Sequence, residues 1–322
     1  MKAAVLHRFG ESPKFGDFPE PVPEGDGQLL VRVRSASLKN IDRARASGKH
    51  YASYERLPTV VGLDGVALLP DGSRVFAQGI TGMMAEKALV DKGRCTLLPG
   101  GVDDATGAAL PNAVMGAGLA LQYRGRIRPG ETVLINGATG VTGNMAVQLA
   151  RYFKAGLIIA TGRNPDSLAL LKSRGAHVCL PLGDDLSDRL RKIHQERGID
   201  LVIDYLWGKP AEMVLYALRG DGLDANKPQV RFVTVGSMAG ETIQLASGIL
   251  RSAPIEVIGS GFGSVAADVM DKMSSEILPE MLRLAAEGGL VIDTVTAPLE
   301  EIEAAWGRQV PGGKRMVITM PL

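Results

Sequence analysis

Hydrophobic and polar positions follow two different patterns along the chain. Up to about residue 110, short apolar runs are interrupted by glycine and proline, and residues 29–33 alternate as a half-buried strand does. Residues 60–66 form a second apolar run with glycines beside it, and the proline-rich residues 19–28 are typical of a turn. This part of the chain is predicted to be rich in strands, with little room for long helices.

From Glu131 onward, short apolar runs alternate with segments of helical spacing. Strands are expected at residues 132–135, 157–160, 177–180, 200–204, 230–235 and 255–258. Helices are expected near residues 144–153, 184–197, 209–219 and 265–286. A further helix begins at Asn164-Pro165-Asp166, which supplies an N-cap, a proline at the first helical position and an acid in the first turn. This alternation predicts an α/β fold with a doubly wound parallel sheet.

After Gly289 the chain returns to short strands, the last at residues 314–318, so its end resembles its beginning more than its middle. We therefore expect a discontinuous, mostly β domain made of residues 1–112 and 265–322. The Rossmann nucleotide-binding domain, residues 113–264, is expected to be inserted into it. A length of 322 residues is consistent with two domains.

Composition and charge narrow the class of protein. The chain is 45% hydrophobic and 22% charged, and its net charge of +1 gives no global field to attract nucleic acid or an anionic membrane. No apolar run approaches the ~20 residues of a membrane-spanning helix, and MKAAVLHRFG reads as a strand and a turn. Cys95 and Cys179 have no neighbouring cysteine, which fits a reducing cytoplasm and excludes a cysteine-rich zinc site. A cytoplasmic protein is expected.

The segment VLINGATGVTGNMAVQLAR carries a dinucleotide fingerprint between a strand and a helix. Its spacing is Ala138-x-Gly140-x-x-Gly143, and glycine there lets the backbone approach a pyrophosphate at the helix N-terminus. The residues expected to bind the cofactor here are Ala138, Thr139, Gly140, Val141 and Gly143. Glycine-rich turns also occur for packing reasons, and that alternative stays open for the motif alone.

The second strand ends about twenty residues after Gly143 in four further residues that we expect to bind the cofactor, Thr161, Gly162, Arg163 and Asn164. No carboxylate is present from residue 157 to 165, where an NAD-preferring enzyme has an acid for the ribose hydroxyls. The planar guanidinium of Arg163 can instead pair with a 2′-phosphate, which predicts NADPH as cofactor. The alternative is that Arg163 is a solvated loop residue.

Further residues should complete the cofactor site, because ligands bind beyond the carboxyl ends of parallel strands. The fourth strand ends in Asp204-Tyr205. The fifth and sixth strands add the expected cofactor-binding residues Gly236, Ser237, Gly259, Ser260 and Phe262.

The stretch AALPNAVMGAGLALQYRGRIRPGETVLINGATGVTGNMAVQLAR resembles the quinone oxidoreductase (zeta-crystallin-like) branch of the medium-chain dehydrogenase/reductases. LPTVVGLDGVA, AEKALV, LVIDYLWG and GGKRMVI extend the resemblance over nearly the whole chain. It implies that the discontinuous domain is GroES-like and binds the substrate, and that NADPH delivers a hydride to it. It also implies a homodimer formed through the strand in IEVIGS.

The positions at which zinc-dependent relatives bind their catalytic metal are Lys39, Leu63 and Asn112 here, with Asp64 where those relatives have Glu. Leucine cannot ligate zinc, and an ammonium opposes a cation. The resemblance therefore implies a zinc-independent enzyme. Without a Lewis acid the acceptor must already be electrophilic, such as a quinone or an α,β-unsaturated carbonyl.

Several positions differ from the better-known quinone reductases. Lys39 replaces an Asn while Asp42 is retained, Lys87 replaces a Tyr, and Gly116 and Gly118 replace a Thr and a bulky aromatic residue. These changes suggest a differently shaped, roomier substrate pocket.

The catalytic candidates are Lys39, Asp42, Asp64 and Tyr51. A lysine can stabilise an enolate or phenolate oxygen, or donate a proton if burial lowers its pKa. The alternative is a salt bridge of Lys39 with Asp42 or Asp64. Tyr51 and Tyr54 either line the entrance for the substrate or pack at the surface.

Two other functions remain open from the sequence. An enoyl-thioester reductase needs a basic entrance, for which Arg43, Arg45 and Lys49 are candidates, although a solvated helix face explains them as well. A cofactor-binding structural or regulatory protein with little catalysis is the second, and the glycine at position 116 is its main support.

Overall fold

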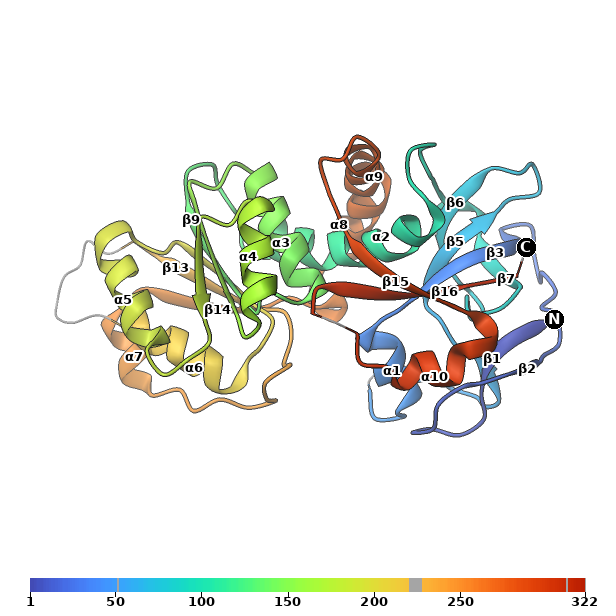
Figure 1. Cartoon of the computed structure of the whole chain (residues 1–322), viewed down its shortest axis with the longest axis horizontal. Coiled ribbons are helices and arrows are strands. Elements are labelled where there is room, and N and C mark those ends of the chain that lie inside the picture. The colour runs from blue at the N-terminus through green and yellow to red at the C-terminus, as the bar shows by residue number, and fades with distance from the viewer. Residues whose placement is uncertain (51, 220–227, 311, 322) are drawn as a thin grey trace. The chain divides into compact units, whose positions relative to one another are not determined.

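The computed structural model describes residues 1–50, 52–219, 228–310 and 312–321 (Figure 1). The chain divides into two compact units. The first is Met1–Asn112 with Lys272–Leu322, and the second is Ala113–Asp271. The first unit resumes at Lys272, the last residue of α8 (Ala267–Lys272), and the sequence had placed this point at residue 265.

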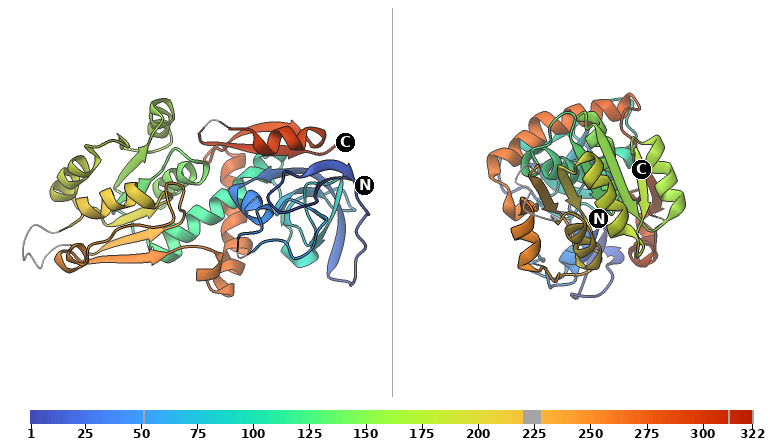
Figure 2. Two further views of the ribbon diagram at one scale, coloured as in Figure 1. Left: turned by 90° about the horizontal axis from the view of Figure 1, so that it is seen from below. Right: turned by 90° about the vertical axis from the view of Figure 1, so that its left-hand side faces the viewer.

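The second unit contains a six-stranded parallel sheet with the order β11-β10-β9-β12-β13-β14. Its strands are β9 (Thr132–Asn136), β10 (Leu157–Gly162), β11 (Val178–Pro181), β12 (Leu201–Asp204), β13 (Val230–Thr234) and β14 (Ile255–Gly259). The chain starts in the centre at β9, builds outward to β11, and then continues on the other side of β9 from β12. This reversal of direction is where doubly wound sheets bind their ligands. The sheet can be followed from two more directions in Figure 2.

Helices cover both faces of this sheet (Figure 1). They are α3 (Val141–Tyr152), α4 (Pro165–Ser173), α5 (Leu186–Arg197), α6 (Gly208–Ala217) and α7 (Ser247–Ser252). Leu134, Val202 and Phe232 of the sheet form one core with residues of α5 and α6, while α3 and α4 contact β9, β10 and β11. The predicted cap of α4 is confirmed, since the Asn164 side chain accepts a hydrogen bond from the Ser167 N–H. The sequence thus predicted the architecture of this unit.

The first unit is built mostly on antiparallel strand pairs, and its last two strands pair in parallel. A three-stranded sheet has the order β2-β1-β4, with β1 (Lys2–Leu6), β2 (Lys14–Asp17) and β4 (Thr59–Val60). A seven-stranded sheet runs β15-β16-β3-β5-β6-β8, with β7 also paired to β3. Its strands are β3 (Gln28–Leu38), β5 (Asp64–Leu68), β6 (Arg74–Gln78), β7 (Lys87–Asp91), β8 (Thr96–Leu97), β15 (Asp293–Pro298) and β16 (Lys314–Thr319). Pairing of Met316 with Leu38 brings the two ends of the chain into one sheet.

The remaining helices are α1 (Asn40–Ala46), α2 (Asp104–Gly118), α9 (Leu278–Ala286) and α10 (Ile302–Gly307). Short 3-10 or π segments are η1 (Lys92–Arg94), η2 (Leu119–Arg124), η3 (Phe262–Ser264), η4 (Met273–Ile277) and η5 (Leu299–Glu301). Within the described residues, none of the helices has the length and hydropathy needed to cross a bilayer.

The apolar run at residues 60–66 is not the single strand that its hydropathy predicts. It is divided between β4 and β5 by Gly62, whose φ of +104° suits glycine alone. A Cβ at Gly62 would lie 2.8 Å from the Met84 backbone nitrogen. The turn therefore depends on a close approach to a distant segment, which hydropathy cannot indicate.

Candidate dinucleotide site

The carboxyl ends of the four neighbouring strands β9, β12, β13 and β14 are aligned. Asn136 is paired with Asp204, Asp204 with Thr234, and Thr234 with Gly259. The turns that follow these strands therefore leave the sheet at one edge. This edge is the expected position of a ligand in a doubly wound sheet.

The turn after β9 requires glycine at two positions for reasons internal to the protein. Gly137 has a φ of +83°, and a Cβ there would lie 2.8 Å from Leu206 Cγ. At Gly143 a Cβ would lie 2.8 Å from Ala138 Cα and would overlap the Gly137 carbonyl oxygen. These two glycines allow α3 to begin directly against the turn.

Gly140 differs from its neighbours. Its φ of −78° suits any residue, and the nearest protein atom to a Cβ at this position would be 3.7 Å away. Neither the backbone conformation nor packing against the described part of the chain therefore demands glycine here. The missing side chain leaves open space in front of the α3 N-terminus, where a pyrophosphate can approach the free backbone N–H groups.

The end of β10 lies beside this turn. The Ala138 N–H donates to the Thr161 carbonyl over 2.8 Å, and a Cβ on Gly162 would overlap the side chain of Thr139. Arg163 is exposed and forms no hydrogen bond or ion pair with any residue that the structure describes. Its guanidinium is thus available to an external anion.

The other predicted cofactor residues belong to the turns after β13 and β14. The Ser237 hydroxyl donates to Glu241 over 2.6 Å, and the Ser260 N–H donates to the Thr234 carbonyl over 2.8 Å. Gly259 accepts a hydrogen bond from Arg124 Nε over 2.7 Å through its carbonyl. Gly236 follows β13, and Phe262 begins η3. The predicted residues of the second unit therefore come from turns at the same edge.

A chain of buried polar side chains lies beneath this edge. The Asn136 amide donates to Asp204 Oδ1 over 2.7 Å, and the Thr161 hydroxyl donates to Asn136 Oδ1 over 2.6 Å. Thr161 Oγ1 in turn accepts a hydrogen bond of 3.0 Å from the Gly137 N–H, which is the first residue of the glycine turn. Asn136, Thr161 and Asp204 all have an exposed fraction of 0%.

The Asp204 carboxylate also fixes the turn between β12 and α6. It accepts hydrogen bonds from the backbone N–H groups of Trp207, over 2.9 Å, and Leu206, over 3.3 Å. Burial raises the pKa of Asp204 to about 6, although the three hydrogen bonds favour its charged form.

Trp207 has a backbone conformation that non-glycine residues rarely adopt, with φ of +52° and ψ of −158°. Such a conformation costs on the order of 1–3 kcal/mol and persists only where the surroundings enforce it. The hydrogen bond to Asp204 and the packing of the indole edge-to-face on Phe232, 6.3 Å between ring centroids, provide that enforcement.

Sequence reasoning did not single out Asn136 or Trp207. A signal for Asn136 exists, because a polar residue ends the otherwise apolar strand TVLIN. No comparable signal exists for Trp207, whose conformation depends on contacts from other elements.

The catalytic candidates of the first unit form a buried ion-pair cluster. Lys39 Nζ lies 2.8 Å from Asp64 Oδ1 and 3.4 Å from Asp42 Oδ2. The same ammonium donates to the Ser37 carbonyl over 2.9 Å and lies 3.1 Å from Ser37 Oγ. Exposed fractions are 1% for Lys39, 0% for Asp42 and 2% for Asp64. The salt-bridge alternative predicted for Lys39 is therefore present with both carboxylates.

Asp42 and Arg315 complete this cluster. Asp42 accepts the Lys39 N–H over 2.9 Å and the Leu63 N–H over 3.0 Å, so it ties α1 to the segment before β5. Burial raises the pKa of Asp64, whereas the charge of Lys39 and its hydrogen bond act in the opposite direction. Burial lowers the pKa of Arg315 to about 10, which still leaves it charged at neutral pH. The positive charges of Lys39 and Arg315 thus balance the negative charges of Asp42 and Asp64.

Tyr51, the fourth catalytic candidate, lies outside the described residues. The hydroxyl of Tyr54 is buried, and burial raises its pKa to about 12. Arg45 stacks on the Tyr54 ring at 4.3 Å and donates to the Ala52 carbonyl, while Arg43 donates to the Trp306 carbonyl. Two of the three cations predicted for a basic entrance are therefore already engaged within the first unit.

Two of the remaining departures from the quinone reductases, Lys87 and Gly116, have local explanations, and Gly118 has none. Lys87 forms an ion pair of 2.7 Å with Glu20. A Cβ on Gly116 would lie 3.2 Å from Thr142 Cγ2, a tight contact with the first turn of α3.

No group of three or more His, Cys, Asp or Glu side chains suited to a metal ion occurs among the described residues.

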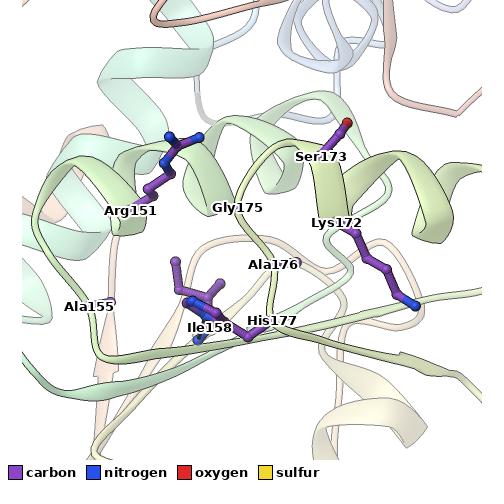
Figure 3. Close-up of a pocket in the computed structure, with 8 residues that line it drawn as sticks. All are labelled: Arg151, Ala155, Ile158, Lys172, Ser173, Gly175, Ala176 and His177. Carbon is purple, nitrogen blue, oxygen red and sulfur yellow. Dashed lines mark hydrogen bonds between the residues drawn. The ribbon is translucent and has the colours of Figure 1, made fainter.

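A pocket of about 330 Å³ lies away from the glycine turn, between the last turns of α3 and α4 and the start of β11. Arg151, Lys172 and His177 line it (Figure 3). The side chains of Arg151 and Lys172 point away from one another, so their charges do not converge on one ligand atom. We assign it no function.

Comparisons with known proteins agree with this geometry. Residues 141–287 match the zinc-binding dehydrogenase family. The quinone oxidoreductase of Lama guanicoe is 31% identical over 223 residues, which cover 64% of this chain and 66% of that protein. A phthioceranic/hydroxyphthioceranic acid synthase of Mycobacterium tuberculosis is 31% identical over 222 residues, 65% of this chain but 10% of the synthase. The matches thus span just under two thirds of the first relative and a small part of the second.

Among solved structures, the quinone oxidoreductase of Thermus thermophilus, which was also solved in complex with NADPH, is similar along its whole length. It has a TM-score of 0.76 and 28% identity, and the match covers 99% of this chain and 100% of that one. The sheet order, the glycine turn and these matches lead to one assignment. The chain belongs to the medium-chain dehydrogenase/reductases of the zinc-binding dehydrogenase family, in the quinone oxidoreductase branch.

Proposed function

We propose that the protein is an NADPH-dependent oxidoreductase that reduces a quinone or an α,β-unsaturated carbonyl without zinc. The observation that carries this proposal is Gly140, which is glycine although no residue that the structure describes requires it. Space left at the N-terminus of a helix after the first strand of a Rossmann sheet fits the pyrophosphate of a dinucleotide. The Thermus relative bound to NADPH supports the same ligand.

The preference for NADPH over NADH rests on Arg163. Its guanidinium is exposed, has no protein partner within the described residues, and follows the strand next to the glycine turn. An arginine fork pairs with a phosphate through two parallel hydrogen bonds, whereas an acid at this position would repel it. In this proposal Ala138, Thr139, Val141 and the turn residues after β13 and β14 surround the rest of the cofactor.

The proposed absence of zinc rests on the first unit. The carboxylates of Asp42 and Asp64 are neutralised by the ammonium of Lys39, which takes the place that a metal cation needs. Bound NADPH supplies the hydride. The protein's own contribution is to bind and orient the cofactor and to exclude water from the reacting groups.

We propose that Lys39 holds the first unit together and does not donate the proton. Its ammonium has three donors, and Asp64, Asp42 and Ser37 supply acceptors for all of them inside the protein. Tyr51 stays a candidate for contact with the substrate. The proton required by the reduced acceptor then comes from solvent or from a group outside the cluster.

Two further properties belong to the proposal. The edge strand β14 is paired on one side only and exposes 39% of Val257, and its pairing with a second copy gives a homodimer. The two free thiols, Cys95 and Cys179, fit a cytoplasmic protein.

The test is NADPH oxidation, followed by absorbance, with ortho- and para-quinones, enals, enones and an enoyl-CoA as acceptors and NADH in parallel. Turnover with NADPH on a quinone or an enone is expected, and its loss in Arg163→Glu would tie it to the cofactor site. Turnover restricted to the enoyl-CoA would favour the enoyl-thioester reductase, a reading also compatible with the match to part of an acid synthase. Tight NADPH binding without turnover on any acceptor would favour a non-catalytic role.

A further inference from the structure

Asp204, at a strand end that the sequence places beside the cofactor, accepts three hydrogen bonds from within the protein. Its two oxygens accept one hydrogen bond from β9, through the Asn136 amide, and two from the backbone at Leu206 and Trp207. With an exposed fraction of 0%, it has no access to bulk water. A carboxylate buried in this way is costly unless its hydrogen bonds are made.

The connections of Asp204 reach the glycine turn in two steps. Asn136 Oδ1 accepts from the Thr161 hydroxyl, and Thr161 Oγ1 accepts from the Gly137 N–H. The Thr161 hydroxyl has only one hydrogen to donate, so the direction of this series of hydrogen bonds is fixed when the Asn136 amide donates to Asp204. If the Asp204 carboxylate is replaced by a group that donates to Asn136, the present orientation of the Asn136 amide is no longer stabilised.

The second connection reaches the same turn from the other side. Leu206, held by Asp204, is the side chain that a Cβ on Gly137 would meet at 2.8 Å. Trp207, held by the other carboxylate oxygen, keeps a φ of +52° that would relax without it. Asp204 therefore fixes both the strand end behind the glycine turn and the residue packed against it.

We infer that Asp204 is a positioning residue for the dinucleotide, which it never touches, because it holds the glycine turn in its binding conformation. This inference rests on the proposed cofactor site. The ligand class is a nicotinamide dinucleotide, bound through its pyrophosphate at Gly140.

The groups facing the carboxyl are neutral: the Asn136 amide from β9 and the two backbone N–H groups that begin α6. The neighbouring charged side chains are engaged elsewhere, Lys209 with Glu212 and Glu241 with Ser237. The adjacent phenol of Tyr205 is buried, and burial raises its pKa. A proton taken up by Asp204 near pH 6 therefore removes a hydrogen-bond acceptor for which no other charged group among residues 1–50, 52–219, 228–310 and 312–321 substitutes.

The experiment compares Asp204→Asn with Asp200→Asn, a matched change at the residue that precedes β12. Asp200 accepts the Thr132 N–H over 2.8 Å at the start of β9, away from the glycine turn. Dinucleotide affinity is measured by calorimetry, and thermal stability is measured for each variant. We expect Asp204→Asn to weaken NADP⁺ binding by about tenfold or more, and Asp200→Asn to leave it within about twofold.

A pH series separates positioning from general destabilisation. It uses NAD⁺, because the 2′-phosphate of NADP⁺ titrates near the same pH. Affinity of the unmodified chain should fall as the pH is lowered through about 6, and that of Asp204→Asn should stay flat. Equal affinity loss in both variants, or the same pH dependence with and without Asp204, would overturn the inference.

A readout without cofactor keeps the two proposals distinguishable. In a Trp306→Phe background, Trp207 is the remaining tryptophan, and its emission should change with a midpoint near pH 6 that Asp204→Asn abolishes. If the unmodified chain bound no dinucleotide, the proposed function would fail. If it bound one and Trp207 emission did not respond to pH, the hold of Asp204 on this turn would be refuted. Should Asp204→Asn fail to fold, Thr161→Val breaks the same chain and is expected to weaken binding in the same direction.

Discussion

Replacing Lys39 by Met leaves Asp64 buried without its closest counter-charge. The Lys39 ammonium is 2.8 Å from Asp64 Oδ1, and both side chains are at most 3% exposed. Removing one partner of such a buried pair costs about 3–5 kcal/mol, most of it the penalty of an uncompensated charge. We expect Lys39→Met to lower the free energy of unfolding of the first unit by this amount at about pH 8.

The loss should shrink at lower pH. Burial already raises the pKa of Asp64 above its unfolded value of 3.8, and removing Lys39 removes the main opposing influence. The native state then takes up a proton at a higher pH than the unfolded chain does, so stability rises as the pH is lowered from about 8 to about 5. The double variant Lys39→Met with Asp64→Leu leaves one carboxylate and one guanidinium and should recover most of the loss.

The assay is urea unfolding followed by Trp306 fluorescence in a Trp207→Phe background, since Trp306 belongs to the core of the first unit. Lys87→Met is the matched control, because its ion pair with Glu20 is about 40% exposed on both sides and is expected to contribute less than about 1 kcal/mol. A loss below about 1 kcal/mol in Lys39→Met, or a loss independent of pH, would refute the argument that Lys39 neutralises buried carboxylates.

Three further predictions concern the cofactor site and assembly. Gly140→Ala should weaken NADPH binding about tenfold or more with little change in melting temperature. Gly143→Ala should instead lower the melting temperature, because its Cβ would lie 2.8 Å from the Ala138 backbone. Equal melting temperatures of the two variants would contradict this prediction. Arg163→Glu should raise the KM for NADPH by at least about tenfold and leave the KM for NADH nearly unchanged. A similar rise in KM for both cofactors would refute a contact between Arg163 and the 2′-phosphate. Light scattering should give the mass of two chains, reduced to one chain in Val257→Asp on the exposed edge strand; a single-chain mass for the unmodified protein would exclude the dimer.

The sequence alone was sufficient for the parallel sheet of the second unit, although it did not predict α7. Alternating apolar runs and helical spacing predicted all six strands of the parallel sheet, and local signals such as Asn164-Pro165-Asp166 located the start of α4. These features depend on residues close together in the chain, which is why they can be recognised from the sequence. The same holds for the spacing of Ala138, Gly140 and Gly143 in the glycine turn.

What the glycines do was decided by tertiary structure. The motif does not distinguish Gly143, which a Cβ would force against Ala138, from Gly140, which has free space. Hydropathy predicts one strand at residues 60–66, but Gly62 divides this run between two strands, because Met84 from another segment packs against Gly62.

The charged residues show most clearly which features the sequence predicts and which depend on tertiary structure. The sequence identified Lys39, Asp42 and Asp64 as chemically interesting but left a catalytic lysine and a salt bridge as alternatives. Asp64 is 25 residues from Lys39, and Asp204 is 68 residues from Asn136. The packing of segments that are distant in sequence decides whether a charged side chain is buried and which group forms an ion pair or hydrogen bond with it. Local residue patterns therefore determined the sheet and the glycine turn. Only the folded chain determined which polar groups lose contact with water and which partners compensate them.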